Sequence, residues 1–169
     1  GECTNQTPWG YPTPQQKVGI LCRKEYVIEY FDVCKTPLVA VEYLSVDRMS
    51  GTEPRQNFHE DTDLPEVIRV KLSDYDGRGE AGFDIGHVAP AADFRDNSEA
   101  MAQSFLLSNT VPQAAKNNRG FWRALELRVR SIAGSEGGVF VMTGMIYNDL
   151  NSRFNGMCIP SYMYKVIIN

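Results

Sequence analysis

The sequence has little that would suit a membrane segment or a metal cage. Its 169 residues contain no run of eighteen apolar residues, which excludes a transmembrane helix. Only two histidines occur, and the four cysteines form no C-x-x-C pair and have no histidine at ligand spacing, so a zinc site is not expected. There is no internal repeat and no low-complexity tract. A hydrophobic content of 43% suits one globular domain with a real core.

The charge balance of the chain is slightly acidic. A formal net charge of −4 argues against a protein that coats DNA tightly and passively, but it allows an enzyme that must release a polyanionic product. Basic residues nevertheless gather in one predicted helix, namely Lys116, Arg119, Arg123, Arg128 and Arg130. We interpret Arg128 and Arg130 as part of a solvated face.

The cysteines are even in number and widely spread, at Cys3, Cys22, Cys34 and Cys158. This pattern favours two disulfides in an oxidising compartment, and the alternative is four buried thiols. The chain begins at Gly1 rather than Met, which is typical of a mature form that has lost a targeting segment or of a trimmed sequence. We therefore expect a secreted or periplasmic protein.

Strand length limits how the cysteines can pair. Cys22 opens a predicted strand and Cys34 lies in the turn at its far end. At about 3.3 Å per residue, their Cα atoms lie far beyond the separation that a disulfide allows. A Cys22–Cys34 bond is thus excluded, and with it the complementary Cys3–Cys158 bond. The remaining schemes are Cys3–Cys22 with Cys34–Cys158, and Cys3–Cys34 with Cys22–Cys158. We favour the first, because the N-terminal arm can fold back onto the strand that it precedes.

Strand and helix patterns are interspersed without regular alternation, which indicates an α+β fold with a mainly antiparallel central sheet and flanking helices. We expect an irregular arm over 1–19 and a single domain over 20–169 that opens with a hairpin. The expected strands span 20–31, 38–46, 81–87, 139–145 and 161–168, the expected helices 97–107 and 118–132, and the expected connections 47–80 and 109–116. A connection as long as 47–80 is a frequent place for functional residues.

His87 is the leading candidate for acid–base chemistry. It ends a predicted strand, and the preceding Gly86 permits close backbone approach and space beside the imidazole. An unperturbed imidazole is largely neutral near pH 7 and can accept a proton from water. The alternative is a structural histidine. The other histidine, His59, lies in the polar connection, and we do not expect it to act.

Asn118 and Glu126 are candidate partners of a divalent cation. Mg²⁺ prefers oxygen ligands and keeps several waters, so one amide oxygen at Asn118 leaves coordination positions for phosphate oxygens. Glu126 lies eight residues further on, too far for the same inner coordination shell, so we expect it to act through metal-bound water. The alternatives are a helix cap for Asn118 and a surface ion pair with Arg123 or Arg130 for Glu126.

Four segments follow one another in a fixed order along the chain: Asp84-Ile85-Gly86-His87, Asn109-Thr110-Val111-Pro112-Gln113, Asn118, and Trp122-Arg123-Ala124-Leu125-Glu126. They resemble the D-R-G-H signature, the N-x-x-P-Q segment, the metal-ligand asparagine and the W-x-x-L-E segment of the DNA/RNA non-specific endonucleases, a family of the ββα-metal (His-Me finger) superfamily. The resemblance covers most of 20–168, and the combination in this order is specific.

The resemblance implies a ββα-metal nuclease fold and a Mg²⁺-dependent enzyme, with Mn²⁺ as a substitute, that hydrolyses DNA and RNA to 5′-phosphate ends. It implies His87 as the general base, Asn118 as the only direct protein ligand of Mg²⁺, and Glu126 as the residue that orders metal waters. Arg55 would face the phosphate and Asn109 would support the site. A protein inhibitor or immunity protein is a further partner to consider, whereas the sequence makes no statement about oligomeric state.

Ile85 departs from the signature, which has arginine at this position. The neighbouring Asp84 is retained, and the resemblance places it in the catalytic group. The change removes a permanent cation near the phosphate, so binding would be weaker, the substrate range narrower, or another cation must substitute. Arg119 and Arg95 are the expected substrate-binding substitutes, and Arg78 is a further candidate. We expect activity to survive, because the general base His87, the metal ligand Asn118 and the carboxylate of Glu126 remain.

Two other functions stay open. One is a nucleic-acid-binding protein with a lapsed active site, which the change at Ile85 motivates. The other is a disulfide-stabilised extracellular interaction domain in which His87 is structural. Metal-dependent cleavage separates an enzyme from the first alternative. Binding of a protein partner without action on nucleic acid would favour the second.

Overall fold

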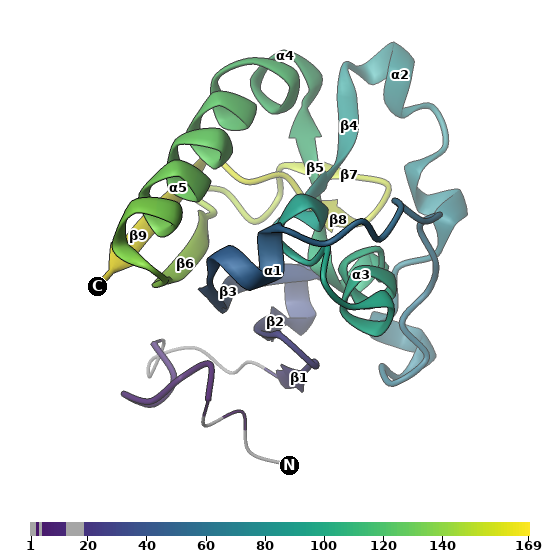
Figure 1. The fold of residues 1–169 in the computed structure, drawn as a ribbon. Coiled ribbons are helices and arrows are strands. Elements are labelled where there is room, and N and C mark those ends of the chain that lie inside the picture. The colour runs from purple at the N-terminus through teal and green to yellow at the C-terminus, as the bar shows by residue number, and fades with distance from the viewer. Residues whose placement is uncertain (1–2, 4, 13–18) are drawn as a thin grey trace.

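The computed structural model describes residues 3, 5–12 and 19–169, and its central feature is a five-stranded antiparallel sheet (Figure 1). In spatial order the strands are β1 (Gly19–Cys22), β2 (Tyr26–Phe31), β3 (Thr36–Leu44), β6 (Val139–Ile146) and β9 (Tyr162–Ile168). Every residue of β2 is buried, and so is every residue of β3 except Tyr43. These two strands therefore form the centre of the core. The predicted α+β class with a mainly antiparallel sheet is confirmed.

The single strand predicted over 20–31 is wrong in its middle, where the chain reverses. The N–H of Arg23 donates to the carbonyl oxygen of Tyr26 at 2.9 Å, and β1 and β2 pair antiparallel on either side of this turn. Ion pairs from Arg23 to Asp61 and Asp63 hold the turn against the following connection. The second hairpin, between β2 and β3, is present as predicted.

A smaller unit of two strands and a helix stands beside this sheet (Figure 1). The strands β4 (Phe83–His87) and β5 (Thr110–Ala114) pair antiparallel, and the chain then enters α4 (Ala115–Asn117), the π-helical turn η6 (Asn118–Trp122) and α5 (Arg123–Glu136). The loop predicted over 109–116 is therefore wrong for β5. Pro112 pairs with Ile85 in this ribbon. Proline is tolerated there because a two-stranded ribbon leaves one edge of each strand without a ladder partner.

The connection predicted over 47–80 is ordered, and short helical turns interrupt it. They are α1 (Val46–Met49), η2 (Glu66–Ile68), η3 (Leu72–Tyr75) and α2 (Arg78–Ala81). Its middle is tied to the core by backbone bonds, since the N–H of His59 donates to the Phe105 carbonyl at 3.1 Å and the N–H of Leu107 donates to the His59 carbonyl at 2.8 Å. These bonds fix the loop that carries Arg55.

Three short elements connect β4 to β5: η4 (Ala91–Asp93), α3 (Ser98–Ser104) and η5 (Leu107–Asn109). The helix α3 begins where predicted, because the side chain of Asn97 accepts the N–H of Ala100 at 3.0 Å. It is shorter than the predicted 97–107. Phe105 and Leu107 follow it and are 1% and 0% exposed, so the chain leaves the helix to bury these side chains.

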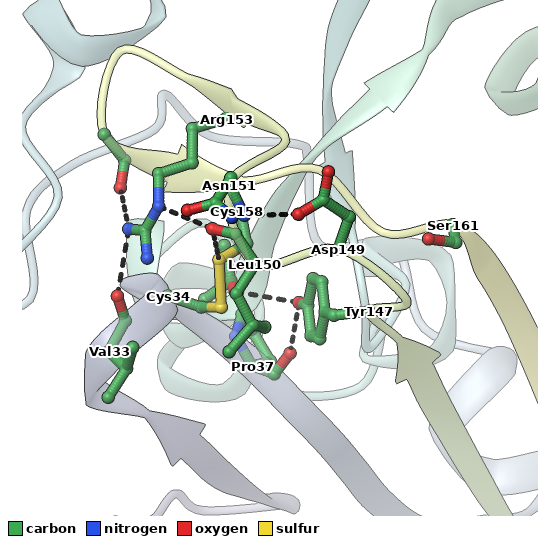
Figure 2. Close-up of a disulfide and its surroundings, with 12 residues drawn as sticks. Val33, Cys34, Pro37, Tyr147, Asp149, Leu150, Asn151, Arg153, Cys158 and Ser161 are labelled. Atoms are coloured by element: carbon green, nitrogen blue, oxygen red, sulfur yellow. Dashed lines mark hydrogen bonds between the residues drawn. A yellow bond between two sulfur atoms is a disulfide. The ribbon is translucent and has the colours of Figure 1, made fainter.

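Both predicted disulfides are present in the favoured scheme, as Cys3–Cys22 and Cys34–Cys158. The second joins η1 (Asp32–Cys34) to β8 (Met157–Cys158), which pairs with β7 (Arg153–Phe154) (Figure 2). Next to this bond, the guanidinium of Arg153 donates to the carbonyl oxygens of Val33 at 3.0 Å and Gly156 at 2.9 Å. The covalent link and these hydrogen bonds together hold the loop between β6 and β9 against the turn between β2 and β3.

Part of the predicted N-terminal arm, residues 1, 2, 4 and 13–18, lies outside the described residues. The described residues 5–12 form turns and bends, and Trp9 packs edge-on against Phe140 of β6 with 4.7 Å between ring centroids. The division into an arm over 1–19 and a domain over 20–169 stays a prediction. Within the described ranges, no helix has the length and apolar character needed to cross a membrane.

Candidate active site

A cleft of about 620 Å³ opens beside β4, α5 and the loop that precedes His59. Its lining includes Arg55, Phe58, Arg78, Asp84, Ile85, His87, Asn118, Arg119, Arg123, Glu126 and Arg130. Six of the predicted site residues therefore meet in one cavity: Arg55, Asp84, His87, Asn118, Arg119 and Glu126. They come from the long connection, from β4 and from the helix, so the ββα unit and one loop build the site.

His87 ends β4, and its ring packs against two aromatic rings. The imidazole centroid lies 4.9 Å from that of Phe58 and 4.8 Å from that of Phe105, edge to face with the latter. The Nε2 atom is buried and has no hydrogen-bond partner among the described residues. Burial, and to a smaller extent the charge of Arg55, lowers the pKa of His87 to about 3. The imidazole is therefore neutral, and its Nε2 atom makes no hydrogen bond to the described residues.

Gly86 is required by its neighbour on β5. A Cβ atom at this position would collide with the side chain of Gln113. Gln113 in turn donates through Nε2 to Oδ1 of Asn117 at 2.8 Å. The glycine thus lets β5 and the start of the helix approach β4 closely, as predicted, while the space that it leaves beside the imidazole stays a prediction.

Asn118 reaches across from the helix to β4. Its Nδ2 donates a hydrogen bond of 2.9 Å to Oδ2 of Asp84, which leaves its Oδ1 atom available to another group. Arg119 forms a two-pronged ion pair with the same carboxylate, through Nε at 2.9 Å and Nη2 at 2.6 Å. The hydrogen bond from Arg119 is the largest cause of a lowered pKa at Asp84. Because the Asn118 side chain is engaged with β4, the alternative of a helix cap does not hold.

Glu126 lines the same cleft from α5. It makes no ion pair within the part of the chain that the structure describes, so the alternative of a surface pair with Arg123 or Arg130 does not hold either. Burial raises the pKa of Glu126, while the nearby charge of Lys165 opposes that rise. The carboxylate is thus a partly desolvated acceptor at the wall of the cleft.

Buried charges from distant parts of the chain lie behind Glu126. Nη1 of Arg130 pairs with Oδ1 of Asp93 at 2.8 Å, and Asp93 is 2% exposed. The predicted solvated face is therefore wrong for Arg130, although Arg128 is exposed. Glu42 of β3, 3% exposed, has its pKa raised well above the usual value by burial and by the neighbouring Asp93.

Lys165 of β9 completes this group. Its Nζ atom donates to Oγ1 of Thr143 at 2.7 Å and lies 5.1 Å from the centroid of the Trp122 ring. Burial lowers the pKa of Lys165, while the charges of Glu42, Asp93 and Glu126 oppose the change. The lysine therefore links the core of the sheet to the base of the cleft.

Asn109 lies behind His87 and fixes the chain that follows it. Its Oδ1 atom accepts the N–H of Ala89, and its Nδ2 donates to the carbonyl oxygens of Ala89 and Ser104, all at 2.9 Å. Its own carbonyl oxygen accepts the N–H of Val88 at 2.9 Å. The side chain is fully buried, and its supporting role at the site stays a prediction.

Of three further residues considered in the sequence, one lines the cleft and two do not. Arg55 is exposed at the cleft, with its guanidinium carbon 5.2 Å from the ring centroid of Phe105. Arg95 is not among the described residues that line the cleft, and its backbone N–H donates to the carbonyl oxygen of Arg48 at 2.9 Å. His59 is exposed and also lies outside the cleft lining.

The oxygen atoms of the cleft suit a hard cation that keeps most of its water. Asn118 offers one neutral amide oxygen, and Glu126 offers a carboxylate on the same wall. The described residues contain no cluster of three or more His, Cys, Asp or Glu side chains that could form a metal cage. A single amide oxygen with a more distant carboxylate fits Mg²⁺ better than Zn²⁺.

The chain matches a known protein family over most of its length. Residues 6–169 match the family model described as DNA/RNA non-specific endonuclease. The chain belongs to this endonuclease family. The resemblance inferred from four short segments is therefore confirmed across nearly the whole length of the chain.

Individual nucleases of other organisms are similar to this endonuclease-family chain. "Nuclease EXOG, mitochondrial" of Danio rerio is 33% identical over 157 residues, which cover 85% of this chain and 45% of that protein. "Nuclease C1" of Cunninghamella echinulata var. echinulata is 33% identical over 165 residues, which cover 86% of this chain and 63% of that protein. The chain thus spans less than two thirds of the length of these relatives.

A solved structure shares the fold of the endonuclease-family chain. The crystal structure of the EndoG/EndoGI complex superposes with a TM-score of 0.82 at 24% sequence identity, covering 97% of this chain and 71% of that chain. This likeness concerns the fold alone, and it agrees with the predicted arrangement of β4, β5 and the following helix.

Sequence reasoning missed several residues at or behind the cleft. Arg130 follows Glu126 by four positions in the helix, and this spacing is the signal that could have placed both on one face. No local pattern marked Phe58 and Phe105 as the neighbours of His87. No local pattern indicates the position of Lys165 beneath the cleft, because that position depends on the pairing of β6 with β9.

Proposed function

We propose that the chain is a Mg²⁺-dependent endonuclease that hydrolyses phosphodiester bonds of DNA and RNA and leaves 5′-phosphate ends. The observation that carries this proposal is the neutral imidazole of His87, at the end of β4, in a cleft that Asn118 and Glu126 also line. A free base, a neutral oxygen ligand and a carboxylate in one cavity are the groups that metal-assisted hydrolysis requires.

Asn118 would hold Mg²⁺ through its Oδ1 atom, and Glu126 would hold it through water. Mn²⁺ should substitute, because it accepts the same oxygen ligands. The bound cation would polarise the phosphoryl group and stabilise the leaving 3′ oxygen. Asp84 presents Asn118 in the required orientation, since it accepts the amide hydrogen and leaves Oδ1 outward, and Arg119 fixes Asp84.

The remaining residues accept the proton from water, support the base and bind the phosphate. His87 accepts a proton from the attacking water while Phe58 and Phe105 hold the ring in place. Asn109 fixes the backbone directly after His87. Arg55, exposed at the cleft, binds the phosphate. Recognition of backbone rather than base edges gives cleavage without strict sequence demands.

A bound phosphate would counteract the lowered pKa of His87. A group with a pKa of about 3 accepts a proton reluctantly near pH 7. A phosphate anion beside the imidazole favours the protonated form and so raises its pKa toward the working pH. A bound phosphate would therefore make His87 a better base.

The proposed function is tested by digesting supercoiled plasmid DNA and a long RNA with Mg²⁺, with Mn²⁺ and with EDTA. We expect both polymers to be cut with either metal and neither to be cut in EDTA. The product ends should be degraded by an exonuclease that requires a 5′ phosphate. Binding without cutting under every metal condition would favour the alternative of a lapsed site. Absence of both binding and cutting would contradict the proposal.

Location and partners are proposed on separate grounds. Two disulfides support an oxidising compartment, and a secreted or periplasmic location is our proposal. Several similar proteins are named mitochondrial nucleases, so protease protection in fractionated cells is the measurement that decides. The similar solved structure is that of EndoG with EndoGI and concerns its inhibition, which supports a protein inhibitor as a partner to seek.

A further inference from the structure

Five arginines line the cleft, but two of them are already neutralised by carboxylates. Arg119 is held by Asp84 and Arg130 is held by the buried Asp93. A guanidinium whose hydrogen-bond donors are committed to a carboxylate in this way adds little attraction for a second anion. The cationic character available to a ligand must therefore come from the other three arginines.

Of these three, Arg55 has been assigned to the phosphate beside His87. Arg78 at the start of α2 and Arg123 at the start of α5 are exposed, line the cleft and make no ion pair among the described residues. Within the described chain, the only hydrogen bond of the Arg78 guanidinium is a long one of 3.3 Å, to the carbonyl oxygen of Tyr75. Both guanidinium groups are thus free to bind an anion.

The three substitutes considered for the arginine missing at Ile85 are now distinguishable. Arg95 does not line the cleft among the described residues, and Arg119 is committed to Asp84. Arg78 remains, and it lies near enough to Asp84 for its charge to act on that carboxylate, one residue away from Ile85.

We propose that Arg78 and Arg123 bind backbone phosphates of a nucleic-acid strand other than the phosphate that Arg55 contacts, and that Arg78 takes the place of the cation absent at Ile85. The inference rests on the proposed function and deepens it, since the two residues define the extent of the substrate site. The ligand class is a nucleic-acid strand with at least three backbone phosphates, one for each arginine. A dinucleotide, which has a single phosphodiester, would leave two of the three arginines unused.

The overall charge of the chain makes Arg78 and Arg123 more important for binding nucleic acid. With a formal net charge of −4, the protein as a whole does not attract nucleic acid, so affinity depends on the few cations that are not neutralised. Removing one of them should therefore produce a clear effect. In a strongly basic protein, by contrast, the loss of one arginine changes the affinity for nucleic acid less, because many other cations contribute.

The test measures binding of a fluorescent duplex DNA by anisotropy in EDTA, where no metal-dependent cleavage occurs, at salt concentrations between 50 and 200 mM. Arg78→Ala and Arg123→Ala should each weaken binding and each reduce the salt slope of log K by about 0.9. Over this fourfold rise in salt, each variant should then lose about 3.5-fold less affinity than the wild type.

Arg128→Ala is the matched control, because Arg128 lies on the same helix, is exposed and does not line the cleft. Its slope and affinity should equal those of the wild type. Unchanged slopes in Arg78→Ala and Arg123→Ala, or an equal loss in Arg128→Ala, would overturn the proposal. Failure of the wild type to cut nucleic acid would instead count against the proposed function, which the metal-dependent digestion tests separately.

Discussion

The desolvated imidazole of His87 makes the stability of the protein depend on pH. Its pKa is about 3 in the folded protein and near 6.5 in an unfolded chain. Between these two values the unfolded state binds the proton and the folded state does not. The contribution of His87 to the free energy of unfolding therefore becomes more unfavourable as pH falls from about 6.5 toward 3.

Replacement of His87 by Gln should remove this contribution. Urea denaturation at pH 7, 5 and 4 should show a smaller loss of unfolding free energy in His87→Gln than in the wild type, because all other titrating groups are shared. The comparison uses the change with pH within each protein, so a constant packing defect in the variant cancels. An identical pH dependence in the two proteins would show that the folded state binds this proton normally.

Asn118 is expected to act on the metal more than on the fold. Asn118→Ala removes the Oδ1 atom, so calorimetry should show loss of Mg²⁺ binding together with loss of cleavage. Asn118→Asp should retain some Mg²⁺ because a carboxylate is a stronger ligand, yet bind phosphate less well because of its added charge. Mg²⁺ binding that is unchanged in Asn118→Ala would remove this residue from the metal site.

The strand β4 carries the residue in which this chain departs from its family. Ile85 lines the cleft but also packs against an apolar cluster that includes Val70, Tyr75, Leu107 and Met157. Ile85→Arg should therefore lower the melting temperature, by an amount equivalent to about 1–3 kcal/mol, because a charge replaces a half-buried apolar side chain. Thermal unfolding followed by circular dichroism measures this.

The same variant has a second expected effect on binding. If the new guanidinium reaches the cleft, the salt slope for duplex DNA should become steeper by about 0.9 even though the fold is weaker. Unchanged melting temperature and unchanged slope would together mean that Ile85 neither packs nor faces the substrate, contrary to its position here.

The ββα unit could be predicted from the sequence because its functional residues lie close together in the chain and in recognisable order. Two elements were missed for local reasons. Pro112 and the polar residues near it made β5 look like a loop, although a two-stranded ribbon tolerates proline. The turn at Arg23 contains no glycine or proline, and the ion pairs that stabilise it come from residues about forty positions away.

The charges behind Glu126 could not be predicted, because they depend on long-range strand register. Thr143 of β6 pairs with Lys165 of β9, and β6 also pairs with β3, which carries Glu42. Glu42 and Lys165 lie 123 positions apart in sequence (165 − 42), and no periodicity within one strand indicates its neighbour in the sheet. The prediction therefore located the groups at the cleft surface and missed those beneath it.

For the molecule as a whole, the two disulfides should contribute unequally to stability. The Cys34–Cys158 bond spans 124 positions and the Cys3–Cys22 bond spans 19. On loop-entropy grounds, the longer link should contribute about 1.7 kcal/mol more to the free energy of unfolding. Urea denaturation of Cys34→Ala/Cys158→Ala and of Cys3→Ala/Cys22→Ala measures the difference. A larger loss from the second pair would show that native contacts outweigh chain entropy here.

The central claim is that His87, and not the other histidine, is the base of a metal-dependent nuclease. The most direct measurement is the rate of plasmid cleavage in Mg²⁺ by the wild type, His87→Ala and His59→Ala, each with its fold checked by circular dichroism. We predict that His87→Ala loses about 10²–10⁴ in rate while remaining folded, and that His59→Ala cleaves like the wild type. Near-wild-type cleavage by a folded His87→Ala, or loss of cleavage in His59→Ala, would contradict the account.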